Sequence, residues 1–297
     1  MKQDIFRIGI IGGSGLGDAL TLQAGGTAVA VDTPFGEPSA PIITTEIESV
    51  PVAFLSRHGL GHMLSPSSVP YRANIYALKK LGVTHIIASG ATGSLAEQIE
   101  PRHLVVPDQL IDKTFRRVGS FFEGELAVHV DFAYPFCQKL RQSLLDAAEA
   151  VDTTVHDGGT YLCMEGPQFS TRAESILHRS WGAQLVGMTC MPEARLAREA
   201  EMCYALVALP TDYDCWKEHP GDRDKHALMN EIIANLNAAT ENAIKLIKAA
   251  IGRTAELLDT DCEHQRALEL GIWSDKNRIT DPTWHKLKLL IEKYAGN

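Results

Sequence analysis

Thr211-Asp212-Tyr213-Asp214-Cys215-Trp216 follows an apolar run at Cys203–Leu209, and this pairing decides the fold class. The run predicts a buried strand, and open α/β sheets bind their ligands just beyond the carboxyl ends of such strands. Alternate residues of an extended chain point the same way, so Asp212 and Asp214 are expected to face one spot. Two carboxylates there suit a ligand that carries two hydrogen-bond donors on one edge. The alternative is a solvated acidic turn that caps the next helix.

The composition is that of a globular protein with a sizeable core: of 297 residues, 45% are hydrophobic and 22% are charged. The net charge of −9 argues against a nucleic-acid partner, because binding a phosphate backbone needs a basic surface. No apolar run approaches the ~20 residues that span a bilayer. Met1-Lys2-Gln3-Asp4 leads into a strand rather than a signal peptide. We therefore expect a cytoplasmic protein that binds neither nucleic acid nor membrane.

The six cysteines are scattered along the chain without Cys-x-x-Cys pairs. They stand at positions 137, 163, 190, 203, 215 and 262. This spacing indicates neither a zinc site nor a disulfide framework. We interpret most of them as small buried hydrophobic residues and expect no metal ion.

Short apolar segments bounded by Gly, Pro or Asp predict strands, and helical patterns lie between them. Strands are expected at Phe6–Ile11, Thr27–Val31, Pro41–Ile47, Pro51–Leu55, His85–Ser89, His103–Val106, Thr160–Met164, Gln184–Gly187 and Cys203–Leu209. Helices are expected at Tyr71–Leu81, Pro135–Val151, Thr171–Trp181, Pro192–Glu201 and Lys225–Ile251. Thr171-x-x-Glu174 has the capping-box form. The alternation implies an α/β fold with a largely parallel sheet.

The chain changes character at Gly252, so we predict a main domain at residues 1–251 and a helical extension at 252–297. Mixed, charged sequence runs to Ile279, and Asp281-Pro282 then opens a terminal helix with apolar residues at helical spacing.

Gly12-Gly13-Ser14-Gly15 follows the first expected strand and is a candidate phosphate cradle. Glycines let the backbone turn tightly and approach an anion, and the Ser14 hydroxyl adds a donor. A dinucleotide fingerprint is the competing interpretation, with Asp32 as its ribose-binding acid, but the Gly-x-Gly-x-x-Gly spacing is not met. A glycine-rich turn without a ligand is the third possibility.

Ser56-Arg57-His58-Gly59 also stands at the end of an expected strand. The Arg57 fork suits bidentate contact with phosphate, and His58 can add a second donor to the same anion. A salt bridge beside a buried imidazole is the alternative. His58 and His62 have a zinc-like spacing, but the glycines at 59 and 61 disfavour the helix that such a site requires.

Three more segments contribute small, aromatic or sulfur-containing residues. Ser89–Ser94 holds glycines and hydroxyls that keep bulk away from a phosphate or sugar. Met164–Ser170 and Gly187–Glu193 offer an aromatic face, Phe169, together with Met and Glu residues that can bracket a ribose. Each of these residues is equally compatible with an ordinary turn or core position.

Together these segments closely resemble the trimeric purine nucleoside phosphorylases, in particular their 5′-methylthioadenosine phosphorylase subgroup. The resemblance covers the chain from about Ile8 to Ile251 and rests on ordered blocks: Gly9–Leu16, Asp32–Gly36, Arg57–Gly59, Ala73–Lys79, Gly93–Leu95, Glu165–Pro167, Arg172–Ser175, Met188-Thr189, Pro192-Glu193 and Thr211–His219. It implies a single α/β domain around a mixed, distorted sheet, assembly as a homotrimer, and phosphate-dependent cleavage of an N-glycosidic bond. It implies no metal or organic cofactor, because inorganic phosphate is a co-substrate.

The resemblance also implies roles for individual residues. It places phosphate at Ser14, Arg57, His58, Gly90, Ala91 and Thr189. It places Met188 under the ribose, Phe169 beside the purine, and Ser170 at a position linked to substrate choice. Asp212 is the implied proton donor to purine N7, and Asp214 is the implied acceptor from a 6-amino group.

The 5′ end of the substrate is the part that this resemblance specifies least. His129 matches a histidine that reaches the 5′ end of a neighbouring subunit's substrate. Residues 220–225 depart from the family pattern, so Leu228 and Met229 are only the expected wall around the 5′ group. The extension from Gly252 onward matches no part of that pattern.

Three functions remain open at this point. The first is phosphorolysis of an adenine-type 5′-methylthionucleoside. The second is phosphorolysis of 6-oxopurine nucleosides, for which an Asn is expected in place of Asp212 or Asp214 because a 6-oxo group is an acceptor. The third is a non-catalytic nucleotide-binding or dinucleotide-binding protein, which has no need of a separate phosphate pocket.

Overall fold

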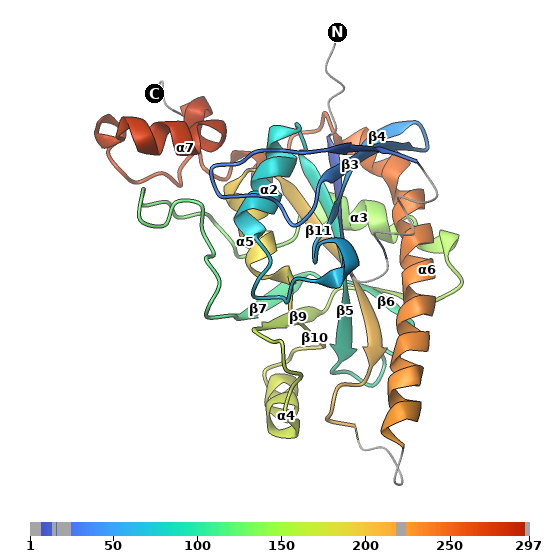
Figure 1. The fold of residues 1–297 in the computed structure, drawn as a ribbon. Coiled ribbons are helices and arrows are strands. Elements are labelled where there is room, and N and C mark those ends of the chain that lie inside the picture. Colours follow the sequence, from blue (N-terminus) through green and yellow to red (C-terminus); the bar gives the residue numbers. More distant parts are fainter. Residues whose placement is uncertain (1–6, 14–15, 17–24, 218–223, 295–297) are drawn as a thin grey trace.

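A computed structural model describes residues 7–13, 16, 25–217 and 224–294 of the chain (Figure 1). An 11-stranded sheet forms its centre. The strands are β1 (Ile8–Gly12), β2 (Thr27–Val29), β3 (Ile42–Ile47), β4 (Val50–Ser56), β5 (His85–Ser94), β6 (Leu104–Val106), β7 (Gln109–Lys113), β8 (Val155–Asp157), β9 (Thr160–Met164), β10 (Leu185–Gly187) and β11 (Cys203–Asp212).

The sheet branches at β5, which pairs with three strands. Its first half lies between β1 and β11, both parallel to it, whereas Gly93 and Ser94 pair with the antiparallel β10. The path runs β2-β3-β4-β1-β5-β10-β9-β7, while β11 continues to β6 and then to β8. Parallel and antiparallel pairings therefore occur in one sheet, which confirms the mixed, distorted sheet rather than a largely parallel one.

Helices cover both faces of this sheet (Figure 1). They are α2 (Tyr71–Lys80), α3 (Gln138–Leu145), α4 (Arg172–Ser180), α5 (Cys190–Glu199), α6 (Lys225–Leu257) and α7 (Asp281–Ile291). Short 3-10 turns stand at Leu60–His62, Ala148–Ala150, Glu263–Arg266, Lys276–Arg278 and Glu292–Tyr294.

Burial on both faces explains why β11 reads as one continuous apolar run. Tyr204 and Leu206 join the core that contains α2 and α5 residues, whereas Ala205 and Val207 join the core under α6. A strand covered on both sides has no polar face to alternate with.

Several boundaries differ from the sequence prediction. Two short strands, β7 and β8, were not predicted, and β5 runs five residues further than expected, to Ser94. The helix expected at Pro135–Val151 is shorter, because α3 ends at Leu145 and a 3-10 turn follows. The capping box at Thr171 and Glu174 is present and starts α4.

The C-terminal extension packs against the rest of the chain. Leu287, Leu290 and Ile291 of α7 are buried in the same core as Ile11 and Leu55. α6 itself crosses the expected boundary and ends at Leu257. The division at residue 252 stays a prediction. Across the described ranges, no helix is both long and apolar enough to cross a membrane.

Candidate active site

A cavity of about 270 Å³ lies at the carboxyl ends of β4, β5 and β11. Ten of the predicted site residues line it: Arg57, His58, Gly90, Ala91, Phe169, Ser170, Met188, Thr189, Asp212 and Asp214. Ser14 lies outside the described residues. The remaining three, His129, Leu228 and Met229, do not line the cavity of this subunit.

Arg57 forms the floor of the cavity through a buried ion pair with Glu193 on α5. Its Nε and Nη2 atoms each donate to one oxygen of the Glu193 carboxylate at 2.8 Å, and Nη1 donates to the Ser89 carbonyl at 2.7 Å. Both side chains are buried, and the Tyr204 hydroxyl also donates to Glu193 at 2.8 Å. Burial alone lowers the pKa of Arg57, but the charge and hydrogen bonds of Glu193 raise it above its ordinary value.

This pairing limits how the Arg57 fork can be used. Glu193 occupies the edge formed by Nε and Nη2, and the Ser89 carbonyl accepts from Nη1, so Arg57 keeps one N–H on Nη1 and one on Nη2 for an anion. It also removes Glu193 from the residues that were expected to bracket a ribose. Glu165 is removed in the same way, because its carboxylate accepts from the Ser67 hydroxyl and from the Phe115 and Arg116 N–H groups.

His58 is held as a neutral imidazole. Burial and then the Arg57 charge lower its pKa to about 4. Its Nδ1 lies 2.8 Å from the Leu64 carbonyl, so the ring proton is on Nδ1 and Nε2 is an acceptor. The ring stacks on His62 at 4.3 Å between centroids. In this state His58 can accept from a protonated phosphate oxygen, whereas the expected donor role requires a protonated ring.

Two glycines allow backbone segments to meet next to Arg57. A Cβ at Gly13 would stand 3.2 Å from Arg57 Nη1 and 3.2 Å from the Ser89 carbonyl. A Cβ at Gly90 would stand 3.4 Å from the Thr189 hydroxyl. Bulk at either position would fill the space beside the guanidinium, so this part of the cavity can hold a small anion.

Thr189 stands at the N-cap of α5, yet its side chain makes no capping hydrogen bond. Its hydroxyl is thus not used by the helix and can donate to a ligand. The first turn of α5 offers few free N–H groups, because the Met191 N–H donates to Cys163 Sγ and Pro192 has none. Arg57, Thr189 and the Gly13 and Gly90 backbone are therefore the candidate anion site.

The two aspartates converge as predicted, but by a turn rather than by strand alternation. Asp212 ends β11, and Asp214 follows in a left-handed conformation with φ of 48°. The Asp214 N–H donates to Asp212 Oδ1 at 2.7 Å, and the Thr211 hydroxyl donates to Asp212 Oδ2 at 2.7 Å. A Cβ at Gly93 would be 3.1 Å from the Asp214 Cβ, so the turn packs directly on β5.

One oxygen of Asp214 is buried without a hydrogen-bond partner. Asp214 Oδ2 has no partner among the described residues, although it lines the cavity. An unpaired buried acceptor is costly, and such atoms in native structures call for a physical reason. A ligand that donates a hydrogen bond at this point supplies one.

Thr92 is a candidate site residue that the sequence interpretation did not single out. Its hydroxyl is also buried without a partner among the described residues, and it lines the cavity between Ala91 and Gly93. The segment Ser89–Ser94 stands out in the sequence for its small and hydroxyl residues. Sequence alone could not distinguish a ligand-binding hydroxyl from one in an ordinary turn.

The opposite wall is less polar. Phe169 is 79% exposed at the cavity rim, and Met188 packs so closely on Gly166 that a Cβ there would meet its sulfur at 2.5 Å. The Ser170 hydroxyl lies 3.7 Å from the Met164 sulfur. A flat apolar ring and two methionines suit a purine and the face of a sugar.

His129 and the start of α6 are positioned away from this cavity. His129 is exposed and packs edge-on against Trp273 at 4.8 Å between centroids. Leu228 is half-buried and Met229 is 51% exposed in the first turns of α6. Their predicted roles at the 5′ end remain predictions.

Comparisons with known proteins identify the family of the chain. A family model described as "Phosphorylase superfamily" matches residues 7–252. Two curated relatives named S-methyl-5′-thioadenosine phosphorylase are similar to the chain. The protein of Geobacter sulfurreducens is 47% identical over 97% of this chain and 99% of its own length, and that of Cereibacter sphaeroides is 49% identical over 88% and 89%.

Solved structures of methylthioadenosine phosphorylases are also similar to this chain. A methylthioadenosine phosphorylase from an Antarctic soil metagenomic library superposes with a TM-score of 0.89 at 43% identity, covering 97% of this chain and 99% of its own. A methylthioadenosine phosphorylase from Schistosoma mansoni in complex with adenine gives a TM-score of 0.81 at 32% identity, covering 90% and 99%. With 97% of the chain covered, the first similarity extends into residues 252–297, which corrects the expectation that this extension has no counterpart among the relatives.

Proposed function

This chain belongs to the phosphorylase superfamily, and we propose that it cleaves the N-glycosidic bond of 5′-methylthioadenosine with inorganic phosphate. The reaction releases adenine and 5-methylthioribose 1-phosphate, and it serves purine and methionine salvage. The enzyme is a pentosyltransferase. The observation that carries the choice of base is the unpartnered Asp214 Oδ2 in the cavity, which has no partner among the described residues.

The base edge favours adenine over a 6-oxopurine. A 6-amino group donates and can pair with Asp214 Oδ2, whereas a 6-oxo group would place a second acceptor against the carboxylate. Such a mismatch leaves both buried groups unpaired and costs about 1–3 kcal/mol. This argument supports the adenine-type nucleoside and disfavours the alternative 6-oxopurine phosphorylase.

The anion site supports phosphate as the co-substrate. Arg57 keeps two guanidinium N–H groups for an anion, and the Thr189 hydroxyl is not used in capping. The neutral His58 ring can accept from a protonated phosphate oxygen. Gly90 and Ala91 line the same region. Ser14, outside the described residues, is proposed as a further donor.

The mechanism follows from the charges that develop. As the C1′–N9 bond breaks, its electron pair moves to the purine and positive charge grows on the ribose. A phosphate oxygen below C1′ stabilises that charge and forms the new bond, while Asp212, protonated in the complex, donates to N7. The Thr211 hydroxyl, which now donates to Asp212, can rotate to accept when Asp212 carries a proton. No metal or organic cofactor takes part in this proposal.

The 5′ end of the pocket is proposed to be completed by a neighbouring subunit. Leu60 and Met63, which are close in sequence to the cavity-lining His62, and Phe115 are each at least 74% exposed. Exposed apolar surface of this kind marks association. We propose a cytoplasmic homotrimer in which His129 of one subunit reaches the 5′ group bound by the next, with Leu228 and Met229 forming an apolar wall around it.

A substrate comparison tests the proposal. The purified protein is assayed with 5′-methylthioadenosine, 5′-methylthioinosine, adenosine and guanosine, each with and without phosphate. Adenine should be released from methylthioadenosine, and phosphate should be required. Adenosine should be poorer by roughly 10-fold or more, because an apolar wall leaves its 5′ hydroxyl unpaired. Faster cleavage of adenosine or guanosine, or turnover without phosphate, would refute the assignment.

A further inference from the structure

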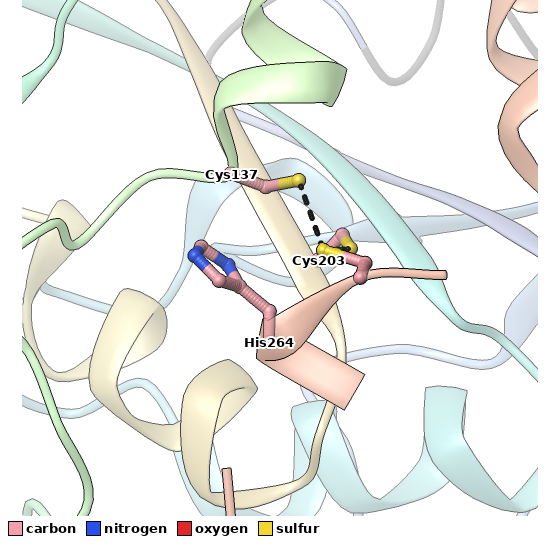
Figure 2. A group of neighbouring side chains, drawn as sticks. Cys137, Cys203 and His264 are labelled. Atoms are coloured by element: carbon pink, nitrogen blue, oxygen red, sulfur yellow. Dashed lines mark hydrogen bonds between the residues drawn. The ribbon is translucent and has the colours of Figure 1, made fainter. Parts of the chain in front are cut away.

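Three cysteines and one histidine meet in the interior of the protein, far from the candidate active site. Cys137, Cys203, Cys262 and His264 are all buried, and one ligand atom of each lies within 4.8 Å of the others. Figure 2 shows the side chains of Cys137, Cys203 and His264 converging from separate segments of the chain. We propose that these four residues form a closed binding site for a thiophilic divalent metal ion such as zinc.

The distances fit metal coordination better than a disulfide. Cys262 Sγ lies 3.3 Å from Cys203 Sγ and 3.7 Å from Cys137 Sγ. Thiolate sulfurs at about 2.3 Å from a tetrahedral ion stand roughly 3.8 Å apart, whereas the two sulfurs of a disulfide stand about 2.05 Å apart. Three thiolates and one imidazole form a set typical of structural zinc sites.

One of the thiols stands where a thiolate is favoured. Cys137 is the N-cap of the eight-residue helix α3, whereas Cys262 precedes a 3-10 turn of four residues. Helix N-termini lower the cost of a thiolate. The side-chain amide of Gln265 lies 4.0 Å from Cys203 Sγ and directs a donor to the third sulfur.

A buried cation balances the charge of the occupied site. Three thiolates and one divalent ion carry a net charge of −1. Arg198 is 5% exposed, contacts the His264 ring at 2.9 Å and pairs with no carboxylate in the part of the chain that the structure describes. Its other hydrogen bonds go to the carbonyls of Asp131 and Tyr134.

Coordination of His264 requires one local change. A metal on either ring nitrogen leaves the proton on the other, so the Arg198 contact with the ring must open. Arg198 then keeps its two carbonyl bonds and stays beside the anionic cluster.

The position of the site indicates a structural role. Cys203 begins β11 and Asp212 ends it, a separation of ~30 Å at about 3.3 Å per residue. Cys262 and His264 belong to the C-terminal extension, so an ion here fastens that extension to β11 and α3. It would stabilise the fold without taking part in the reaction.

Metal analysis tests the proposal. The full-length protein, purified without chelators, should contain about one equivalent of zinc per chain, as a single four-ligand site requires. Apoprotein titrated with Co²⁺ under reducing conditions should develop the thiolate charge-transfer band and the intense visible bands of a tetrahedral site. Cys262→Ser and His264→Ala should each weaken binding by at least roughly 10-fold, and Cys215→Ser, at a cysteine outside the cluster, should leave it unchanged.

Two further measurements distinguish a structural ion from a catalytic ion and from a disulfide. Removing the metal should lower the thermal midpoint by several degrees and leave kcat and KM unchanged at low temperature. Non-reducing peptide mapping should find the cluster cysteines unlinked. A protein that takes up neither zinc nor cobalt would overturn the proposal, as would zinc that both cluster variants retain. Loss of turnover in folded apoprotein, or a native Cys203–Cys262 disulfide, would also overturn it.

Discussion

Asp214 is the residue at which base recognition can be tested most directly. Its Oδ2 is a buried acceptor without a partner among the described side chains, so a bound adenine would gain a bond to a charged oxygen. Such bonds contribute about 1.5–3 kcal/mol. Asp214→Ala, which removes the acceptor, should therefore lower kcat/KM for methylthioadenosine by roughly 10- to 150-fold. Asp214→Asn keeps one oxygen and should lose about 10-fold while gaining relative activity on 6-oxopurines.

The stability of the same variants provides an independent readout. An unpaired buried carboxylate oxygen costs free energy in the empty enzyme, so Asp214→Asn should leave the thermal midpoint unchanged or raise it. Asp214→Ala also places an alanine at a φ of 48°, where a Cβ is strained, and should lower the midpoint relative to Asp214→Asn. Tyr213→Phe is the matched control, because the Tyr213 hydroxyl donates to the Glu97 carbonyl at 3.3 Å and lies outside the cavity. The assay is phosphate-dependent release of adenine under kcat/KM conditions. Variants as active as the parent, or losses equal to that of Tyr213→Phe, would refute the role of Asp214.

Three other predictions concern buried polar groups. Glu193→Gln leaves the Arg57 charge without its carboxylate, so denaturant unfolding should show a loss of about 3 kcal/mol and kinetics a raised KM for phosphate; an unchanged pair of values would contradict the positioning role. Thr92→Val should lower kcat/KM by roughly 5-fold with no loss of stability, since its hydroxyl lacks a partner among the described residues; an unaltered kcat/KM would show that no ligand uses it. Burial raises the pKa of Glu199 to about 7, above its unfolded value. The stability that this group contributes is therefore fully present below pH ~4.5 and is lost as the pH rises through 7. The loss amounts to up to about 3 kcal/mol. Glu199→Gln should lack this decline when unfolding free energies of the two proteins are compared from about pH 5 to pH 8, and parallel curves would contradict it.

The strands that reach the cavity could be predicted because a strand buried on both faces has an uninterrupted apolar sequence. Cys203–Leu209 and His85–Ser89 are apolar on both faces, and both strands start where predicted. Their ends could not be predicted. Gly90–Ser94 has low strand propensity and is extended because β11 and β10 pair with it. β7 and β8 are short and half-exposed, so their sequences show no clear alternation of apolar and polar residues.

The sequence predicted most of the residues that line the cavity, but it did not predict their hydrogen-bond partners. Arg57 and His58 were placed at the cavity, but the Glu193 carboxylate and the Leu64 carbonyl that fix their roles come from other segments of the chain. The same limit applies to the cluster of Cys137, Cys203, Cys262 and His264. Metal sites are recognised in sequence by short spacings between ligands, and these residues meet only through tertiary packing.

The Glu193 partner of Arg57 has a consequence for how the enzyme responds to salt. Because the guanidinium is already neutralised, the cavity attracts phosphate by local hydrogen bonds more than by long-range charge on an acidic protein. Buried pairs are screened little by mobile ions. Phosphate affinity should thus vary weakly with ionic strength. The site should distinguish tetrahedral oxyanions by the acceptor that they present to Thr189 and the proton that they present to His58, rather than by their total charge.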